Sequence, residues 1–274
     1  RVLIKDVPIK LTTMAHQVAG VGGKDHRELQ AQHTTADTEE LLAAHRELWS
    51  HALGYVKSMA LKCALDLGIP DTIQRYGGGA TVGELAAASN LPASSLPFLR
   101  RLMRTLTAMR IFAVHRDDDP SDDPAAAAVV SYQLTATSRL LVNGGSYFSI
   151  RPNISAIVHQ GAVSPMFSMS EWMKQHHHHA PDMTLHEMVH GEPVWESFRA
   201  NPAIRAWFYD AMDADARLVM HVVLSECPAV FHGLASLVDV GGGHGTAAAA
   251  IARAFPHIKC TVMDLPHVVA EAPA

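Results

Sequence analysis

Three consecutive glycines follow a short apolar run with an acidic residue in the stretch LVDVGGGHGTAAAAIARAFP, residues 237–256. Gly241, Gly243 and Gly245 stand in the order G-x-G-x-G, and Asp239 lies two residues before the first of them. Glycines allow the backbone to turn sharply and to approach a ligand closely. A strand, this turn and a following helix therefore indicate a site for a nucleotide-like ligand.

The spacing of the glycines discriminates between ligands. A dinucleotide fingerprint, G-x-G-x-x-G, needs a third glycine where Thr246 stands, and no G-K-[ST] follows as a Walker loop requires. Asp264 closes the next strand, where a carboxylate can accept ribose hydroxyls. No Lys or Arg in the turn could neutralise a phosphate. S-adenosylmethionine, with a ribose, no phosphate and a positive sulfonium, fits this pattern best, and a glycine turn without a ligand is the alternative.

The elements that must position these residues follow from the sequence pattern. SLVDV predicts a short buried strand, GTAAAAIARAF a helix and IKCTVMDL a second strand, which together suit a βαβ unit. Residues 150–230 are mostly helical in pattern. Within them Ile204, Phe208 and Met212 recur at i, i+4 and i+8, which on spacing alone indicates a core-facing stripe.

The N-terminal half predicts a different arrangement. Residues 37–76 read as helix, interrupted by Gly68 and Pro70. Thr81 and Glu84 form a T-x-x-E capping box, so a second helix starts near Val82. A third helix, SSLPFLRRLMRTLTAMR, precedes two strands, IFAVHR and VVSYQLT. Helix, turn, helix and hairpin in this order are typical of a winged helix.

Composition sets limits on the class of protein. The chain has 274 residues and a net charge of -5, which gives no general attraction to nucleic acid or anionic membranes. No apolar run reaches the ~18 residues of a membrane span. Cys63, Cys227 and Cys260 have no metal-ligand or disulfide spacing, so we expect a cytoplasmic protein with reduced thiols. The run His176–His179 could chelate a metal, but no carboxylate or cysteine is spaced to complete a site, so we expect a solvated loop and no metal.

The chain resembles the plant small-molecule O-methyltransferases, which methylate phenolic hydroxyls. The matching stretches are LVDVGGGHG, TVMDLPHVV, ALDLGIPDTI, TVGELAAASNLP, LRRLMRTL and YQLTATSRLL. The resemblance implies a mainly α fold with an α/β part. It places an N-terminal extension, expected to be flexible, at residues 1–36 and a winged-helix dimerisation domain at 37–149. The start of a Rossmann-like methyltransferase domain, truncated at its C-terminal end, then occupies residues 150–274.

The resemblance also implies roles for individual residues. The cofactor is S-adenosylmethionine, and the substrate is a small phenolic or other aromatic molecule. A homodimer is implied, with no nucleic-acid or membrane partner. Ala216 stands where the family often has a serine that holds the cofactor, which puts one hydrogen bond in doubt. The expected cofactor residues are Asp239, Gly241, Gly243, Gly245, Asp264 and Leu265, and the expected substrate residues are Ile204, Phe208 and Met212.

No catalytic residue can be named on this basis. A phenol has a pKa near ~10, so methyl transfer at neutral pH needs a general base. The resemblance places that base, a histidine, after a later strand beyond Ala274. His244 occupies a variable position of the turn and is interpreted as structural or solvent-facing. We therefore expect the 274-residue chain alone to be inactive.

A nucleic-acid-binding regulator with a winged helix is the alternative function. Between Thr81 and Arg116 five arginines stand against one acid, Glu84, which would suit a recognition helix. The adjacent wing, however, carries Asp117, Asp118, Asp119, Asp122 and Asp123, and a wing of that charge repels phosphate. The sequence therefore favours the methyltransferase.

Overall fold

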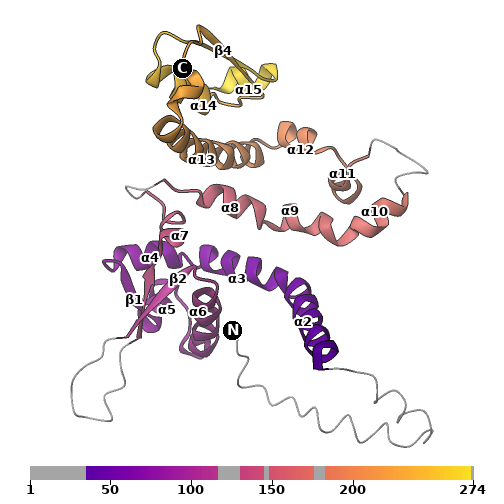
Figure 1. Ribbon diagram of the computed structural model, residues 1–274, viewed down its shortest axis with the longest axis vertical. Coiled ribbons are helices and arrows are strands. Elements are labelled where there is room, and N and C mark those ends of the chain that lie inside the picture. Colours follow the sequence, from indigo (N-terminus) through magenta and orange to yellow (C-terminus); the bar gives the residue numbers. More distant parts are fainter. Residues whose placement is uncertain (1–34, 117–129, 145–147, 176–182, 273–274) are drawn as a thin grey trace, which may run out of the picture. The chain divides into compact units, whose positions relative to one another are not determined.

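The computed structural model describes residues 35–116, 130–144, 148–175 and 183–272 of the chain (Figure 1). Three expected features lie outside these ranges: the N-terminal extension up to residue 34, the five aspartates after Arg116 and the whole run His176–His179. No helix in the described ranges has both the length and the hydropathy needed to cross a membrane. Contacts divide the chain into two units, which are described separately.

The first unit, residues 1–57, is described from helix α2 (Thr35–Ala52) onward. Leu53 interrupts the helical run, and α3 (Gly54–Asp66) begins in this unit and continues into the second. Large apolar side chains of α2 are open to solvent, with 60% of Leu41, 70% of Leu48 and 54% of Trp49 exposed. This helix therefore presents apolar surface that its own unit does not bury.

The second unit, residues 58–274, begins with a small helical core and a three-stranded sheet. The expected break at Gly68 is confirmed, because this residue takes a left-handed conformation (φ 62°) before α4. Leu85, Met103, Leu106 and Phe112 form part of one buried cluster. The elements are α4 (Ile69–Arg75), β1 (Gly79–Thr81), α5 (Val82–Ala88), η1 (Ala93–Ser95), α6 (Leu96–Ala108), β2 (Phe112–Arg116), β3 (Val130–Leu134) and α7 (Ala136–Arg139).

The predicted capping box and hairpin are both present. The Glu84 N–H donates to Thr81 Oγ1 at 3.3 Å, and the Thr81 N–H donates to Glu84 Oε2 at 2.7 Å. Strands β2 and β3 pair antiparallel, and the order of the sheet is β1-β3-β2. Strand β1 was not predicted. It has only three residues, and its partner strand, β3, lies about fifty residues later in the chain.

Arg151 ties this helical core to the following helix, α8 (Arg151–Ile157). Its guanidinium pairs with the Asp71 carboxylate and donates from Nη2 to the Leu65 carbonyl oxygen at 2.8 Å. The other oxygen of Asp71 accepts the Asn143 N–H at 2.7 Å. Two stretches that are distant in sequence, residues 65–71 and 143–151, therefore share one partly buried ionic contact.

Short helices lead to one long helix. They are α9 (Gln160–Val163), η2 (Ser164–Ser168), α10 (Met169–Gln175), α11 (Leu185–His190) and α12 (Val194–Ala200). Helix α13 (Pro202–Glu226) has 25 residues and is capped by Asn201, whose side-chain oxygen accepts hydrogen bonds from the N–H groups of Ala203 and Ile204. It packs against α8 and against α14, so it borders two regions of the unit.

The C-terminal part is the predicted βαβ unit. After η3 (Pro228–Phe231) come β4 (Ser236–Val240), α14 (Thr246–Ala254), β5 (Lys259–Met263) and α15 (Pro266–Glu271). Strands β4 and β5 are parallel, with Leu237 opposite Cys260. The prediction that SLVDV is buried was wrong. Val238 is 58% exposed and Val240 69%. Side chains alternate along both strands, so these two valines lie on the open face of the sheet, whereas Leu237 and Cys260 pack on the opposite face.

Candidate functional site

The glycine turn follows the carboxyl end of β4 and has the backbone shape that its residues predict. Gly241, Gly243 and Gly245 all have positive φ angles, of 74°, 56° and 81°. L-residues with side chains rarely adopt such angles. A β-carbon at Gly242 would lie 2.6 Å from Asp239 Oδ2, so a larger residue cannot replace this glycine without moving the carboxylate.

Two carboxylates meet this turn. Asp264, directly after β5, accepts the Gly243 N–H through Oδ2 at 2.8 Å and the Leu265 N–H through Oδ1 at 2.7 Å. The Oδ2 atom of Asp239 is buried and has no hydrogen-bond partner among the described residues. A buried acceptor of this kind is costly unless a donor reaches it. The structure thus brings all six predicted cofactor residues together at the carboxyl ends of two parallel strands.

Helix α13 holds the glycine turn from one side. The Thr246 hydroxyl donates to Asp213 Oδ1 at 2.5 Å, and Asp213 Oδ2 lies 3.5 Å from His244 Nδ1. The rings of Tyr209 and His244 stack with centroids 4.4 Å apart. Burial raises the pKa of Tyr209, and the charges of Asp264 and Glu271 raise it further. His244 is therefore packed between α13 and the turn, which agrees with a structural role and not with a solvent-facing one.

The predicted substrate residues line a cavity on the same helix. Ile204, Phe208 and Met212 all border a space of about 1100 Å³. Phe198 of α12 packs on Phe208 with ring centroids 4.7 Å apart, and Trp207 also lines the cavity. The stripe that spacing alone assigned to core packing therefore faces a cavity large enough for a small molecule.

Three histidines line this cavity and were not predicted: His159, His186 and His190. The rings of His186 and His190 lie 4.4 Å apart, and burial, followed by the neighbouring charge of His190, lowers the pKa of His186. His186 Nε2 is buried without a partner in the described part of the chain. The i, i+4 spacing of His186 and His190 on a helix is the sequence signal that could have found them.

Neighbouring residues of α13 contact two different regions, the cavity and the glycine turn. Phe208 and Met212 face the cavity, while Tyr209 and Asp213, each one position later, contact the glycine turn. One helix thus sets the distance between the glycine turn and an aromatic-lined cavity. Such an arrangement can hold two small molecules side by side for group transfer.

Comparison with known protein families gives matches to two domain models. Residues 49–144 match the O-methyltransferase dimerisation domain, and residues 168–274 match the O-methyltransferase domain. These matches agree with the fold class predicted from the sequence.

Comparison with individual proteins gives the same family. The chain is 60% identical over 260 residues to the TRIBOA-glucoside O-methyltransferase of Zea mays, covering 89% of this chain and 66% of that protein. It is 41% identical over 250 residues to acetylserotonin O-methyltransferase 1 of Oryza sativa subsp. japonica, covering 90% of this chain and 66% of that protein. The chain therefore spans slightly less than two thirds of the length of these relatives.

Solved structures share the fold. The human N-acetylserotonin methyltransferase in complex with SAM superposes with a TM-score of 0.65 at 18% identity, covering 88% of this chain and 63% of that one. The pyocyanin biosynthetic protein PhzM superposes with a TM-score of 0.64 at 26% identity, covering 84% of this chain and 61% of that one.

Proposed function

This chain belongs to the plant O-methyltransferase family, and from that premise we propose that the protein transfers a methyl group from S-adenosylmethionine to a hydroxyl group of a small aromatic acceptor. The observation that carries the proposal is the alternation along α13. Phe208 and Met212 line the aromatic cavity, and Tyr209 and Asp213 contact the glycine turn. A donor at the turn and an acceptor in the cavity would share one wall.

The residues at the turn fit S-adenosylmethionine. Asp264 keeps free lone pairs that can accept ribose hydroxyls, and nothing lies within 4 Å of the place a β-carbon would take at Gly241. The unpartnered oxygen of Asp239 and the nearby Asp213 make the surroundings acidic. When bound, this cofactor supplies an electrophilic methyl group on a positively charged sulfur, which an acidic site tolerates.

The cavity residues would bind and orient the acceptor. Phe208 and Trp207 offer ring faces for stacking, and Met212 fills the space beside them. Apolar walls also exclude water, so the two reactants are held at close distance. In the proposed reaction, these cavity residues thus position the hydroxyl group of the aromatic acceptor.

Labelled cofactor tests the reaction at the natural length of the protein. We expect methyl-labelled S-adenosylmethionine to bind and NAD not to bind, as measured by calorimetry, and label to appear in members of a panel of hydroxylated aromatics. Binding of NAD in place of S-adenosylmethionine, or label in none of the acceptors, would count against the proposal.

We propose that the acceptor carries a polar group such as a sugar on its aromatic ring. The cavity adds polar side chains to its aromatic wall, namely Lys62 and Asp66 of α3, Asn153 of α8 and Asn201 before α13. Lys62 Nζ donates to Asp66 Oδ2 at 2.5 Å, so these two form a paired polar patch. The Zea mays relative is named for a glucoside, which agrees with this assignment.

A comparison of a glucoside with its aglycone tests the acceptor class. Asp66→Ala should lower kcat/KM for the glucoside about tenfold more than for the aglycone, as expected for the loss of one hydrogen bond to a charged group. Lys174→Ala, on α10 and outside the cavity lining, is the matched control and should change neither value. Equal losses for both acceptors would mean that Asp66 acts only on the fold.

For residues 1–274 alone, we propose that methyl transfer is absent. Val240 is 69% exposed and Met263 55%, on one face of the β4–β5 sheet, whereas parallel sheets normally have both faces covered. We expect such a sheet to hold the turn loosely. The 274-residue chain, incubated with labelled S-adenosylmethionine and the acceptor panel, should give no label above the no-protein background. Label above background would mean that these residues suffice.

A further inference from the structure

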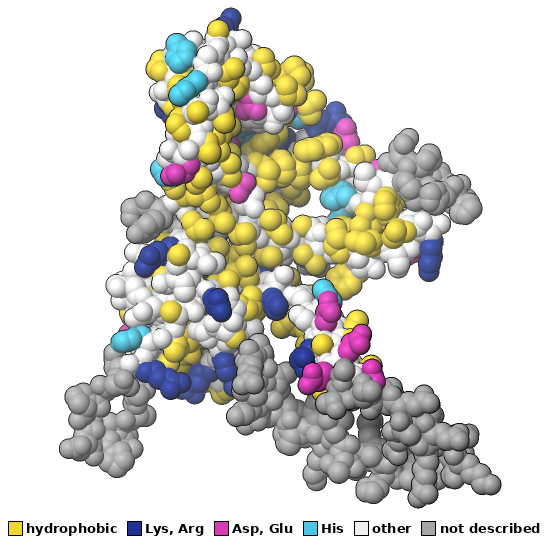
Figure 2. Space-filling view, in the orientation of Figure 1, with side chains coloured by type: hydrophobic (Ala, Val, Ile, Leu, Met, Phe, Trp, Pro, Cys, Tyr) yellow, Lys and Arg dark blue, Asp and Glu magenta, His cyan; other side chains and the backbone are white. Residues whose placement is uncertain are grey.

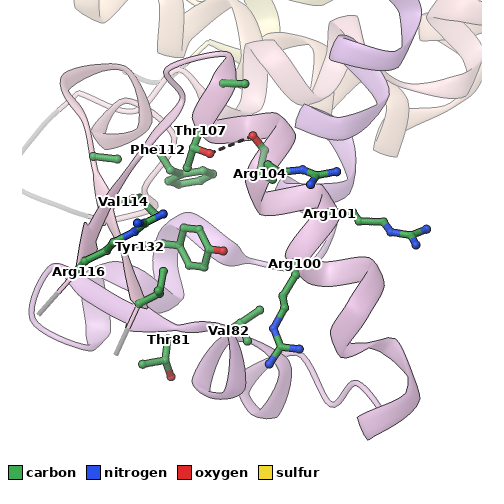
Figure 3. A pocket seen from close by; sticks show the side chains of 13 residues that line it. Thr81, Val82, Arg100, Arg101, Arg104, Thr107, Phe112, Val114, Arg116 and Tyr132 are labelled. Atoms are coloured by element: carbon green, nitrogen blue, oxygen red, sulfur yellow. Dashed lines mark hydrogen bonds between the residues drawn. The ribbon is translucent and has the colours of Figure 1, made fainter. Parts of the chain in front are cut away.

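A cleft in the N-terminal part of the second unit takes no part in the reaction proposed above. It lies between α6 and one face of the strands β2 and β3, and its volume is about 930 Å³ (Figure 3). Cavities that bind small molecules typically have volumes of about 300–1,000 Å³. The cleft is therefore large enough to hold a ligand of its own.

The floor of the cleft is apolar and partly aromatic. Val114 of β2 is opposite Tyr132 of β3 in the sheet, and Phe112 shares their face because side chains alternate along a strand. Phe112 and Tyr132 are buried, whereas Val114 is 46% exposed. Burial raises the pKa of Tyr132 while the charge of Arg100 opposes this, so its hydroxyl remains a donor at neutral pH. A flat, apolar group would find matching surface here.

The walls of the cleft carry four arginines. Arg100 and Arg104 lie one turn apart on α6, Arg116 ends β2, and Arg101 lies over the Phe98 ring at 5.9 Å. None of the described lining residues is acidic, and no salt bridge joins these four arginines to a carboxylate of the described residues. Figure 2 shows basic side chains gathered over this part of the surface. The cleft therefore presents several positive charges around an apolar floor.

We propose that this cleft binds a small ligand with phosphate groups on an aromatic body, such as a nucleotide. Guanidinium groups match phosphate oxygens in paired hydrogen bonds and also stack on flat rings. A phosphate monoester carries a charge of about −1.5 to −2 at neutral pH. The phosphates of a nucleotide therefore balance the charge of several arginines better than one carboxylate would. The apolar floor would receive the base.

The sequence favours a small ligand over a nucleic-acid strand. Five aspartates, Asp117–Asp119, Asp122 and Asp123, follow Arg116 directly in the chain. A long phosphate backbone carries many negative charges, which so acidic a stretch next to the cleft-lining Arg116 in sequence would repel. The winged-helix order of elements alone is therefore not an argument for duplex binding.

Titration calorimetry of the 274-residue chain with ATP, tripolyphosphate and adenosine tests the proposal. We expect micromolar binding of ATP, weaker binding of tripolyphosphate, and binding that weakens as salt is raised. Arg100→Ala/Arg104→Ala should weaken ATP binding by about tenfold or more, and Arg116→Ala should also weaken it. Thermal melting of each variant establishes that it is folded.

Two controls separate this cleft from other sites. Arg217→Ala removes an exposed arginine of α13 that does not line the cleft, and ATP affinity should be unchanged. Asp264→Ala should also leave it unchanged, because the proposed cofactor turn is a different site. Failure of ATP to bind, equal affinity in the double variant, loss of affinity in Asp264→Ala, or tighter binding of a DNA duplex than of ATP would overturn the proposal.

Discussion

Asp264 contacts the glycine turn and is the acceptor that we propose for the ribose hydroxyls. Its two oxygens already accept the N–H groups of Gly243 and Leu265, so its position is fixed before any ligand arrives. Asp264→Ala should weaken S-adenosylmethionine binding by about 1–3 kcal/mol, because ribose hydroxyls would lose their acceptor. Calorimetry on the protein at its natural length measures this.

The matched control for this prediction is Asp215→Ala, since Asp215 is an exposed carboxylate on α13. Its removal should leave the affinity unchanged. An unchanged affinity in Asp264→Ala itself would remove this residue from the cofactor site.

We expect Asp213 to position the glycine turn relative to α13 and not to contribute to the affinity for the acceptor. It accepts a hydrogen bond from the Thr246 hydroxyl at 2.5 Å and stands next to Met212, which lines the cavity proposed for the acceptor. Asp213→Ala should lower kcat about tenfold, the effect of about 1.4 kcal/mol, while the KM for the acceptor changes little. Asp213→Asn keeps an oxygen that can accept from Thr246 and should recover most of kcat. Steady-state kinetics that show a rise in KM alone, or no recovery in Asp213→Asn, would contradict a positioning role.

At the residue scale, the geometry of the glycine turn could be predicted from the sequence because its signal is local. The turn at Gly241–Gly245 and Asp264 belong to one βαβ unit, and one short stretch of sequence specifies it. His159, His186 and His190 were missed because their cavity is assembled from several helices. Of these three, only His186 and His190 have a recognisable sequence pattern, the i, i+4 spacing. That spacing does not indicate whether the two side chains point toward a cavity or toward solvent.

At the scale of elements, the Asp71–Arg151 contact joins α4 to α8. The two side chains are only 27% and 19% exposed, and each makes a further hydrogen bond, to Asn143 and Leu65 respectively. Asp71→Ala should lower the free energy of unfolding by about 2 kcal/mol, because Arg151 would keep a partly buried charge without its partner. Denaturant unfolding measures the change.

The exposed pair Arg199–Glu196 on α12 provides the comparison. Its side chains are 68% and 49% exposed, so solvent screens their attraction. Arg199→Ala should change the free energy of unfolding by less than about 1 kcal/mol. Similar losses in the two variants would mean that burial does not strengthen the Asp71 contact.

Element boundaries show what pattern alone can and cannot predict. The capping box at Thr81 specified the start of α5, since both of its hydrogen bonds are local. Strand β1 was missed because three residues carry no periodicity, and its ladder depends on β3. The strand β4 was predicted as buried from its apolar composition, but burial depends on what packs against each face, which composition does not contain.

At the scale of the whole molecule, we expect a homodimer formed through the N-terminal part. Residues 49–144 match a dimerisation domain, and α2 exposes Leu41, Leu42, Leu48 and Trp49. An apolar face of this kind is normally covered. Leu41→Asp/Leu48→Asp should convert the dimer to a monomer in light scattering at tens of micromolar. Val230→Asp, which changes a 61% exposed valine of η3, should leave the dimer intact. A wild-type monomer at these concentrations would refute the expectation.

The alternation along α13 has a consequence for how related enzymes can diverge. Ile204, Phe208 and Met212 can change in size and reshape the cavity proposed for the acceptor, while Tyr209 and Asp213 stay in place against the glycine turn. If the proposed function holds, a lineage can change its acceptor by mutation without losing its methyl donor, because the two proposed tasks belong to different residues of one helix. Laboratory evolution of acceptor choice would accordingly do best to randomise the first three positions and to hold the other two constant.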